Sequence, residues 1–234
     1  MTLDVAPPGL AATRDALHSV AEQVLAPARV QATGNEIALE PRAGGVGTPD
    51  FPGGGWVAFA GNSLLVAGPD GRASEHLMTS LRVAGLATGL DTADQLPDDP
   101  LVIDLAAAAF LGEVYAFADN ALQELRAEAA PGDDASPIRL WPEHFDIAYE
   151  QGDEAAGERA GYGVSPGDEE HPEPYAYVTP WAGPAGAAEL WNATSFTGAD
   201  LGWSELAAAE HPDQALLEFW RIRRDVLARA SRPA

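Results

Sequence analysis

The sequence contains neither cysteine nor lysine. The lack of cysteine excludes disulfide bonds, thiolate catalysis and metal centres with cysteine ligands, and it fits a reducing compartment. All 13 basic residues are arginines, set against 36 acidic residues, so the formal net charge at pH 7 is −23. A field of that sign repels phosphate backbones and anionic lipids, so we expect neither nucleic acid nor membrane as a partner.

Targeting and membrane signals are also scarce. The first ten residues lack the basic region and apolar run of a secretory signal. The most apolar stretch, residues 101–112, contains Asp104 and falls short of the roughly 20 residues needed to span a bilayer. We therefore expect a cytoplasmic protein.

The spacing of apolar residues predicts an α+β fold. Recurrence every three or four residues predicts helices at residues 8–28, 76–89, 104–129 and 212–230, the third with Asp104 as its N-cap. Short apolar runs predict early strands, with one hairpin turning at Gly61-Asn62, and later strands at 138–149, 158–164, 174–181 and 189–196. Because these strands are grouped, we expect an antiparallel sheet packed with long helices.

The order of these elements bears on domain organisation. A chain of 234 residues with a hydrophobic fraction of 46% can bury one full core, so we expect a single α+β domain over residues 1–234. The order helix-strands-helix nevertheless occurs twice, and the acidic segment 90–100 separates the two occurrences. A duplication with sub-halves 1–90 and 101–234 is the alternative, although the halves share no convincing identity.

Two pairs of metal-ligating residue types give the strongest chemical signal. His144 and Asp146 are two residues apart in a predicted strand, so both would project from one face, and His171 with Glu173 repeats this spacing. If the pairs converge, their nitrogen and oxygen ligands suit a divalent metal such as zinc or iron. The competing interpretation is that His144 only orders its strand through a local hydrogen bond.

Aromatic residues concentrate in the C-terminal half, where five of the six tryptophans follow residue 140. This distribution indicates an aromatic pocket or interface, with Trp141, Glu143, Tyr175 and Trp191 as candidate ligand-binding residues. Strand alternation also places Glu143 on the core side, where a buried carboxylate requires an arginine or backbone donors.

Several segments match known motifs but lack the features that those motifs need. The glycine-rich segment 44–55 precedes a strand rather than a helix, so it lacks the geometry of a phosphate loop. Residues 163–167 match the G-x-S-x-G pattern of serine hydrolases, but Pro166 has no N–H to stabilise an oxyanion. The H-x-D pair also fits an iron oxygenase triad with His211, but a helix rather than a strand follows that histidine. The basic cluster 221–224 is more typical of charge pairing along a helix than of an anion site.

The segments WPEHFDIA (141–148) and YGVSPGDEEHPEPYAYV (162–178) resemble an uncharacterised family of bacterial cytosolic proteins. This resemblance implies a single integrated unit and no particular activity. From the residues themselves, we expect a non-catalytic protein that binds a small molecule or a protein partner. The alternative is a metal-dependent, hydrolase-like enzyme that uses a cleft of His, Asp and Glu.

Overall fold

The computed structural model describes residues 2–230 and confirms the α+β class. It contains two antiparallel five-stranded sheets, with strand orders β1-β2-β3-β4-β5 and β10-β9-β8-β7-β6. Contacts group the chain into two compact units. The first comprises residues 7–116 and 139–145, and the second comprises the described parts of 2–6, 117–138 and 146–230. That the chain forms a single domain stays a prediction.

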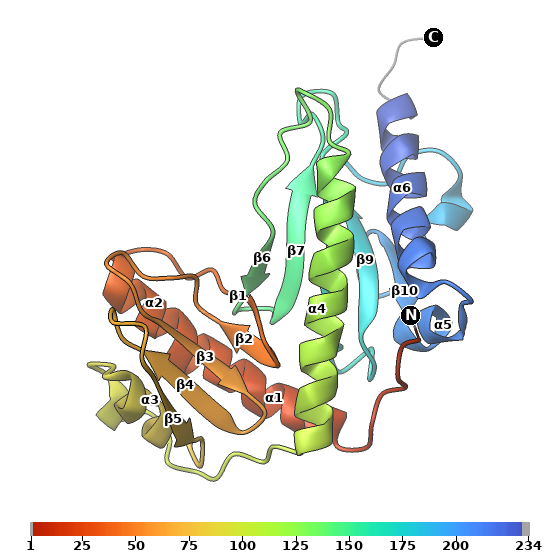
Figure 1. Cartoon of the computed structure of the whole chain (residues 1–234). Helices are drawn as coiled ribbons and strands as arrows, with labels where there is room; N and C mark the ends of the chain where they lie inside the picture. Colours follow the sequence, from red (N-terminus) through yellow and green to blue (C-terminus); the bar gives the residue numbers. More distant parts are fainter. Residues whose placement is uncertain (1, 231–234) are drawn as a thin grey trace. The chain divides into compact units, whose positions relative to one another are not determined.

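The first unit combines an N-terminal helical segment with the first sheet (Figure 1). Its elements are α1 (Leu10–Val20), the π-helix η1 (Ala21–Leu25), α2 (Ala26–Thr33), β1 (Glu40–Arg42), β2 (Gly45–Gly47), β3 (Trp56–Ala60), β4 (Ser63–Ala67), β5 (Ala73–Leu77), α3 (Leu81–Thr88), the 3-10 turn η2 (Ala93–Gln95), the first part of α4 (Leu105–Ala127) and β6 (Arg139–Trp141). The hairpin at Gly61-Asn62 is confirmed, since Ala60 pairs with Ser63 across it.

Two helix boundaries in this unit differ from the predictions. The first helical segment continues through Pro27 to Thr33 rather than ending before the proline. Pro27 cannot donate to the carbonyl four residues earlier, and the preceding turn widens, with the N–H of Ala26 bonding to the carbonyl of Ala21. The helix predicted over 76–89 begins only at Leu81, because Ser80 caps it by accepting from the N–H of Val83.

The second unit packs helices on the second sheet. Its elements are the later part of α4, β7 (Asp146–Gln151), β8 (Ala160–Ser165), β9 (Tyr175–Pro180), the 3-10 turn η3 (Ala188–Leu190), β10 (Ala199–Gly202), α5 (Trp203–Ala208) and α6 (Pro212–Ala230). The strand predicted at 189–196 is wrong, because that segment forms a 3-10 turn and bends, and β10 begins only at Ala199.

Helix α4 begins and ends within two residues of its predicted bounds, and α6 has the predicted bounds of 212–230. Asp104 caps α4 by accepting a hydrogen bond from the N–H of Ala107. By length and composition it is the one helix among residues 2–230 that could cross a membrane, but 61% of its most apolar window is buried inside the protein. The same pattern is typical of a core helix, and cytoplasmic localisation stays a prediction.

The segment WPEHFDIA is not a continuous strand. Residues 142–145 form a turn between β6 and β7, and Phe145 has a left-handed backbone with a φ of 55°. The strand alternation predicted over 138–149 therefore fails at this point. Glu143 is exposed rather than buried, so the prediction that it needs a buried partner is wrong. His144 is exposed on the same turn.

Phe145 is held in this conformation from several sides. Its N–H donates to the carbonyl of Trp141 (2.7 Å), and its own carbonyl accepts from the hydroxyl of Tyr115 (2.6 Å). The ring of His18 stacks on it at a centroid distance of 5.3 Å and an interplanar angle of 3°. A left-handed non-glycine residue is strained, and this surrounding packing compensates the strain. The turn is thus a structural feature of the first unit.

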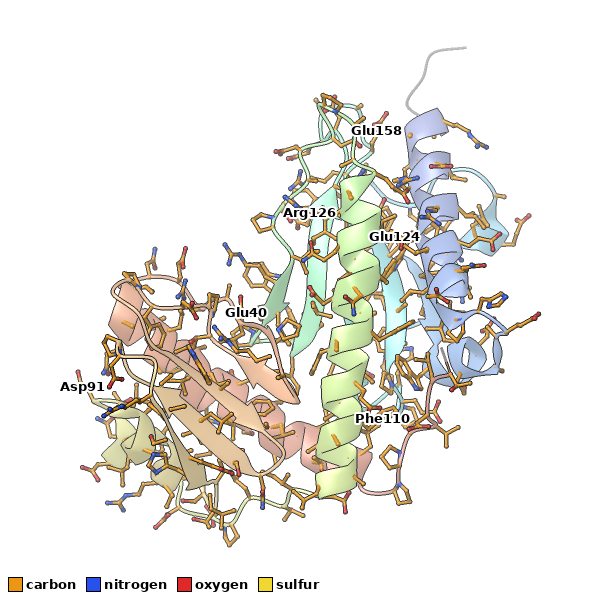
Figure 2. All side chains as sticks on the ribbon, in the orientation of Figure 1. Glu40, Asp91, Phe110, Glu124, Arg126 and Glu158 are labelled. Atoms are coloured by element: carbon orange, nitrogen blue, oxygen red, sulfur yellow. The ribbon has the colours of Figure 1, made fainter. Side chains whose placement is uncertain are left out.

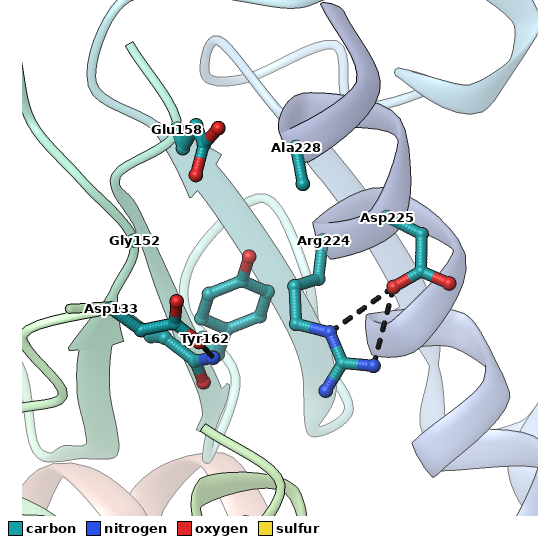
Figure 3. Close-up of a pocket in the computed structure, with 8 residues that line it drawn as sticks. Asp133, Gly152, Glu158, Tyr162, Arg224, Asp225 and Ala228 are labelled. Carbon is teal, nitrogen blue, oxygen red and sulfur yellow. Dashed lines mark hydrogen bonds and ion pairs between the residues drawn. The ribbon is translucent and has the colours of Figure 1, made fainter. Parts of the chain in front are cut away.

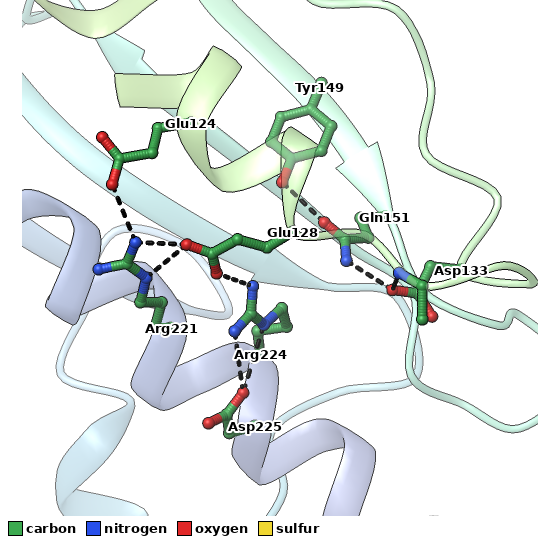
Figure 4. A network of polar contacts seen from close by, with 9 residues as sticks. Glu124, Glu128, Asp133, Tyr149, Gln151, Arg221, Arg224 and Asp225 are labelled. Carbon is green, nitrogen blue, oxygen red and sulfur yellow. Dashed lines mark hydrogen bonds and ion pairs between the residues drawn. The ribbon is translucent and has the colours of Figure 1, made fainter. Parts of the chain in front are cut away.

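In the second unit, ion pairs join α4 to α6. Arg221 Nε donates to Glu128 (2.9 Å) and its Nη2 donates to Glu124 (3.1 Å), while Arg224 Nη1 donates to the other oxygen of Glu128 (2.7 Å) (Figure 4). Glu124 lies on the side of α4 that faces α6 (Figure 2). Arg223 donates instead to the carbonyls of Phe219 and Leu190. All three arginines of the cluster 221–224 are therefore bound to groups within the unit.

The hydroxyl of Tyr115 should contribute measurably to stability. We expect Tyr115→Phe to lower the free energy of unfolding by about 1–3 kcal/mol, because the buried carbonyl of Phe145 loses its donor. Urea denaturation of the full chain measures this change. Tyr162→Phe is the matched control, since that buried hydroxyl has no hydrogen-bond partner among residues 2–230 and its loss should not destabilise. An equal loss in both variants would contradict the assignment.

Stability should depend on pH through Glu128. Its hydrogen bond with Arg221, together with Arg224, outweighs burial and lowers its pKa below the ordinary value of 4.5. Its contribution is therefore full above that value and is lost as the pH falls through the folded-state pKa. We expect Glu128→Gln to destabilise by about 0.5 kcal/mol at pH 7, and the difference from wild type to shrink toward pH 3.

Chemical denaturation across this pH range measures the effect of Glu128. Glu218→Gln is the control, because Glu218 is exposed on α6 and should show no comparable pH dependence. A difference between Glu128→Gln and wild type that stays constant from pH 7 to pH 3 would disprove the linkage.

Candidate functional site

The two faces of the second sheet differ in character. On β9, Ala176 and Val178 are buried on one face, and the backbone carbonyl of Tyr177 accepts from Nε1 of Trp220 on α6 (3.2 Å). Tyr175 and Tyr177 project to the opposite face, where both are only partly buried. We call this opposite surface, with Asp146, Asp168, His171 and Phe196, the tyrosine face.

A glycine in β8 allows Tyr177 to reach across the sheet. Gly163 pairs with Tyr177 on β9 and with Ala148 on β7. A Cβ atom at Gly163 would lie 2.5 Å from the Tyr177 hydroxyl, so only glycine leaves room for the ring. The hydroxyl of Tyr177 donates to the buried carboxylate of Asp146. Burial, followed by the charge of Asp146, raises the pKa of Tyr177, which therefore stays protonated at neutral pH.

Asp168 organises the loop beside β9. Its Oδ1 accepts from the N–H groups of Glu170 (2.8 Å) and His171 (2.7 Å), and its Oδ2 accepts from the hydroxyl of Tyr175 (2.9 Å). Burial alone would raise the pKa of Asp168, but these hydrogen bonds and one with the His171 ring lower it below the ordinary value. Asp168 is therefore a carboxylate at neutral pH.

Aromatic rings surround Tyr175. The His171 ring lies 4.2 Å from it, and the Phe196 ring lies 6.3 Å away in a stacked arrangement, with both distances measured between centroids. Phe196 also meets the edge of Tyr177 at 6.4 Å. The arrangement combines π-faces with two carboxylates, which is a surface chemistry suited to cations.

The structure brings together only some of the predicted site residues. His171 and Tyr175 are in contact, and Asp146 joins the same face through Tyr177. Trp191 instead anchors its own loop, donating from Nε1 to the carbonyl of Ala185 (2.7 Å). The remaining predicted residues are Glu173, which is half-buried in the loop after Asp168, and Trp141, Glu143 and His144, which are exposed in the first unit.

The predicted metal centre is not assembled in the described part of the chain. Among residues 2–230, no three His, Asp or Glu side chains are grouped so that they could hold a metal ion. The physical reason is local. The turn at Phe145 breaks the strand that was to align His144 with Asp146, Asp146 accepts from Tyr177, and His171 faces Asp168.

Asp168, Tyr177 and Phe196 are members of the tyrosine face that the sequence argument missed. The alternation of Tyr175 and Tyr177 in a predicted strand was a usable signal, because residues two apart share a face. The position of Asp168 three residues before His171, in a turn-forming segment, was another. Phe196 gave no such signal, since it lies in an irregular loop.

The chain was compared with known proteins. No protein-family model matches it, and neither the curated proteins nor the solved structures include a significant match.

Proposed function

We propose that the protein is a non-catalytic binding protein whose tyrosine face recognises a guanidinium group, such as the arginine side chain of a partner polypeptide. The observation that carries this proposal is the half-buried ring of Tyr175 beside the ionised Asp168. Both groups are already held in place by neighbouring rings and backbone donors, so little ordering is needed on binding.

A guanidinium matches this surface better than other cations do. It is planar, stacks on aromatic rings and donates two parallel hydrogen bonds to a carboxylate. Tyr175 supplies the ring. The Asp168 side chain is 44% exposed, so its carboxylate remains accessible to a ligand.

The surrounding charge favours a cationic ligand. The loop that follows β8 contains Asp168, Glu169, Glu170 and Glu173 within six residues, and the whole chain has a net charge of −23. Such a field attracts cations and accelerates their association, most strongly at low salt.

The geometry favours binding over catalysis. Burial raises the pKa of both Tyr175 and Tyr177, so neither is a base at neutral pH. Nδ1 of His171 faces Asp168 at 3.2 Å, which fixes the ring. A metal-dependent hydrolase needs converging ligands, and no such group forms among residues 2–230.

Titration with N-acetyl-arginine amide tests the proposal, with the neutral isostere N-acetyl-citrulline amide as the control ligand. We expect saturable binding of the arginine probe alone, weakening as salt is added. Tyr175→Leu removes the π-face and should weaken binding roughly two- to fivefold, which corresponds to about 0.5–1 kcal/mol for an exposed cation–π contact. Tyr175→Phe keeps the ring and should bind within about twofold of wild type.

Asp99→Asn is the matched charge control, because Asp99 is an exposed acid of the first unit. It should leave binding of the arginine probe unchanged. Equal affinity for the arginine and citrulline probes, or full affinity in Tyr175→Leu, would disprove the proposed function.

A further inference from the structure

A cavity separate from the tyrosine face lies in the second unit. It has a volume of about 90 Å³ and is formed where β7 ends, where β8 begins and where α6 makes its last turns (Figure 3). Three carboxylates line it, from Asp133, Glu158 and Asp225, against one guanidinium, from Arg224. None of these residues belongs to the tyrosine face.

Tyr162 adds a buried hydroxyl group to the acidic lining of this cavity. Its side chain is fully buried, and its hydroxyl has no hydrogen-bond partner among residues 2–230. Figure 3 shows that hydroxyl pointing into the space between Glu158 and Arg224. A buried hydroxyl without a partner is unfavourable, and phenylalanine would fill the same space without that cost. The hydroxyl is therefore an open hydrogen-bonding position in the cavity wall.

The polar side chains of Tyr149 and Gln151, which lie near Tyr162, already have hydrogen-bond partners other than its hydroxyl. Tyr149, whose ring lies 5.7 Å from that of Tyr162, donates its hydroxyl to Gln151 (2.8 Å). Gln151 in turn donates to Asp133 (2.8 Å) (Figure 4). The chain of hydrogen bonds passes along the cavity wall without including the Tyr162 hydroxyl.

The charges in the wall select a cation. Arg224 is already bound, with Nη1 donating to Glu128 (2.7 Å) and Nη2 donating to Asp225 (3.2 Å). Arg224 is thus shared between Glu128 and one lining carboxylate, Asp225, so the carboxylates of Asp133 and Glu158 leave the wall with more negative than positive charge. Burial raises the pKa of Tyr162, so the hydroxyl stays neutral and its oxygen can accept a hydrogen bond from a charged donor.

We propose that this cavity binds a primary ammonium group, which donates to the Tyr162 hydroxyl and to the lining carboxylates. A volume of about 90 Å³ corresponds to roughly three water molecules, so it accommodates an ammonium head with one or two carbons. Three N–H donors match a site with several separate acceptors. The methyl group of Ala228 provides an apolar wall for the alkyl part.

Calorimetric titration with ethylammonium chloride tests this site. The titration is made in the Tyr175→Leu background, where binding at the tyrosine face is weakened, and the part of the signal that Tyr162→Phe lowers belongs to the cavity. Sodium chloride and tetramethylammonium chloride are the control salts, since neither cation has an N–H donor. We expect saturable binding of ethylammonium alone, and about tenfold weaker binding in Tyr162→Phe, because a hydrogen bond to a charged group is lost.

Two further variants separate the site from general effects on folding. Ala228→Leu should abolish binding by filling the cavity, while Tyr115→Phe, a buried tyrosine of the first unit, should leave ethylammonium affinity unchanged. Without ligand, Tyr162→Phe should be at least as stable as wild type. Equal binding of the three cations, full affinity in Tyr162→Phe, or a less stable Tyr162→Phe protein would each overturn the ammonium site. None of these results bears on the arginine probe.

Discussion

The packing of helices on the second sheet is the constraint on which the second unit depends, and ion pairs between α4 and α6 reinforce it. Arg221 and Arg224 reach from α6 to Glu124 and Glu128, and the second sheet buries Tyr149 and Tyr162 on its helix-covered face. Burying those tyrosines requires the helices to remain in place, and partly exposed pairs on packed helices reinforce that packing. The same pairs commit Arg224, which leaves the cavity beside Tyr162 with an excess of negative charge.

The scarcity of cationic side chains has a wider consequence. The chain has 13 arginines against 36 acids, and several of the arginines make contacts inside the protein. Arg29 donates to the carbonyls of Pro49 and Asp50. Arg159 binds Glu150 and Asp134 and lies over the Trp181 ring at 5.0 Å. The acids outnumber the arginines by 23, and a surface with that excess of negative charge attracts external cations.

The sequence was informative where one local rule decided the structure. Helix α4 and the Gly61-Asn62 hairpin follow from a capping aspartate and from turn chemistry, and both are confirmed. It was misleading at residues 142–145, where strand alternation looked regular. The left-handed Phe145 is stabilised by Tyr115 and His18, which are 30 and 127 residues away in sequence, counted from the residue numbers. A local pattern cannot reveal stabilisation from such distant partners.

In the candidate sites too, local sequence rules identified some residues, while others depend on contacts between residues distant in sequence. His171 and Tyr175 could be selected from residue type, but their relation to Asp168 depends on a loop in which two backbone N–H groups donate to that one carboxylate. Tyr162 could not be selected, because a tyrosine in a buried strand is ordinarily part of the core. Its distinguishing property is a missing partner, which emerges only after every neighbour has been paired in three dimensions. The two proposed sites on the second unit then differ in the shape of the donor that each would suit: a flat guanidinium against the half-buried ring of Tyr175, and a tetrahedral ammonium among the acceptors of the cavity wall.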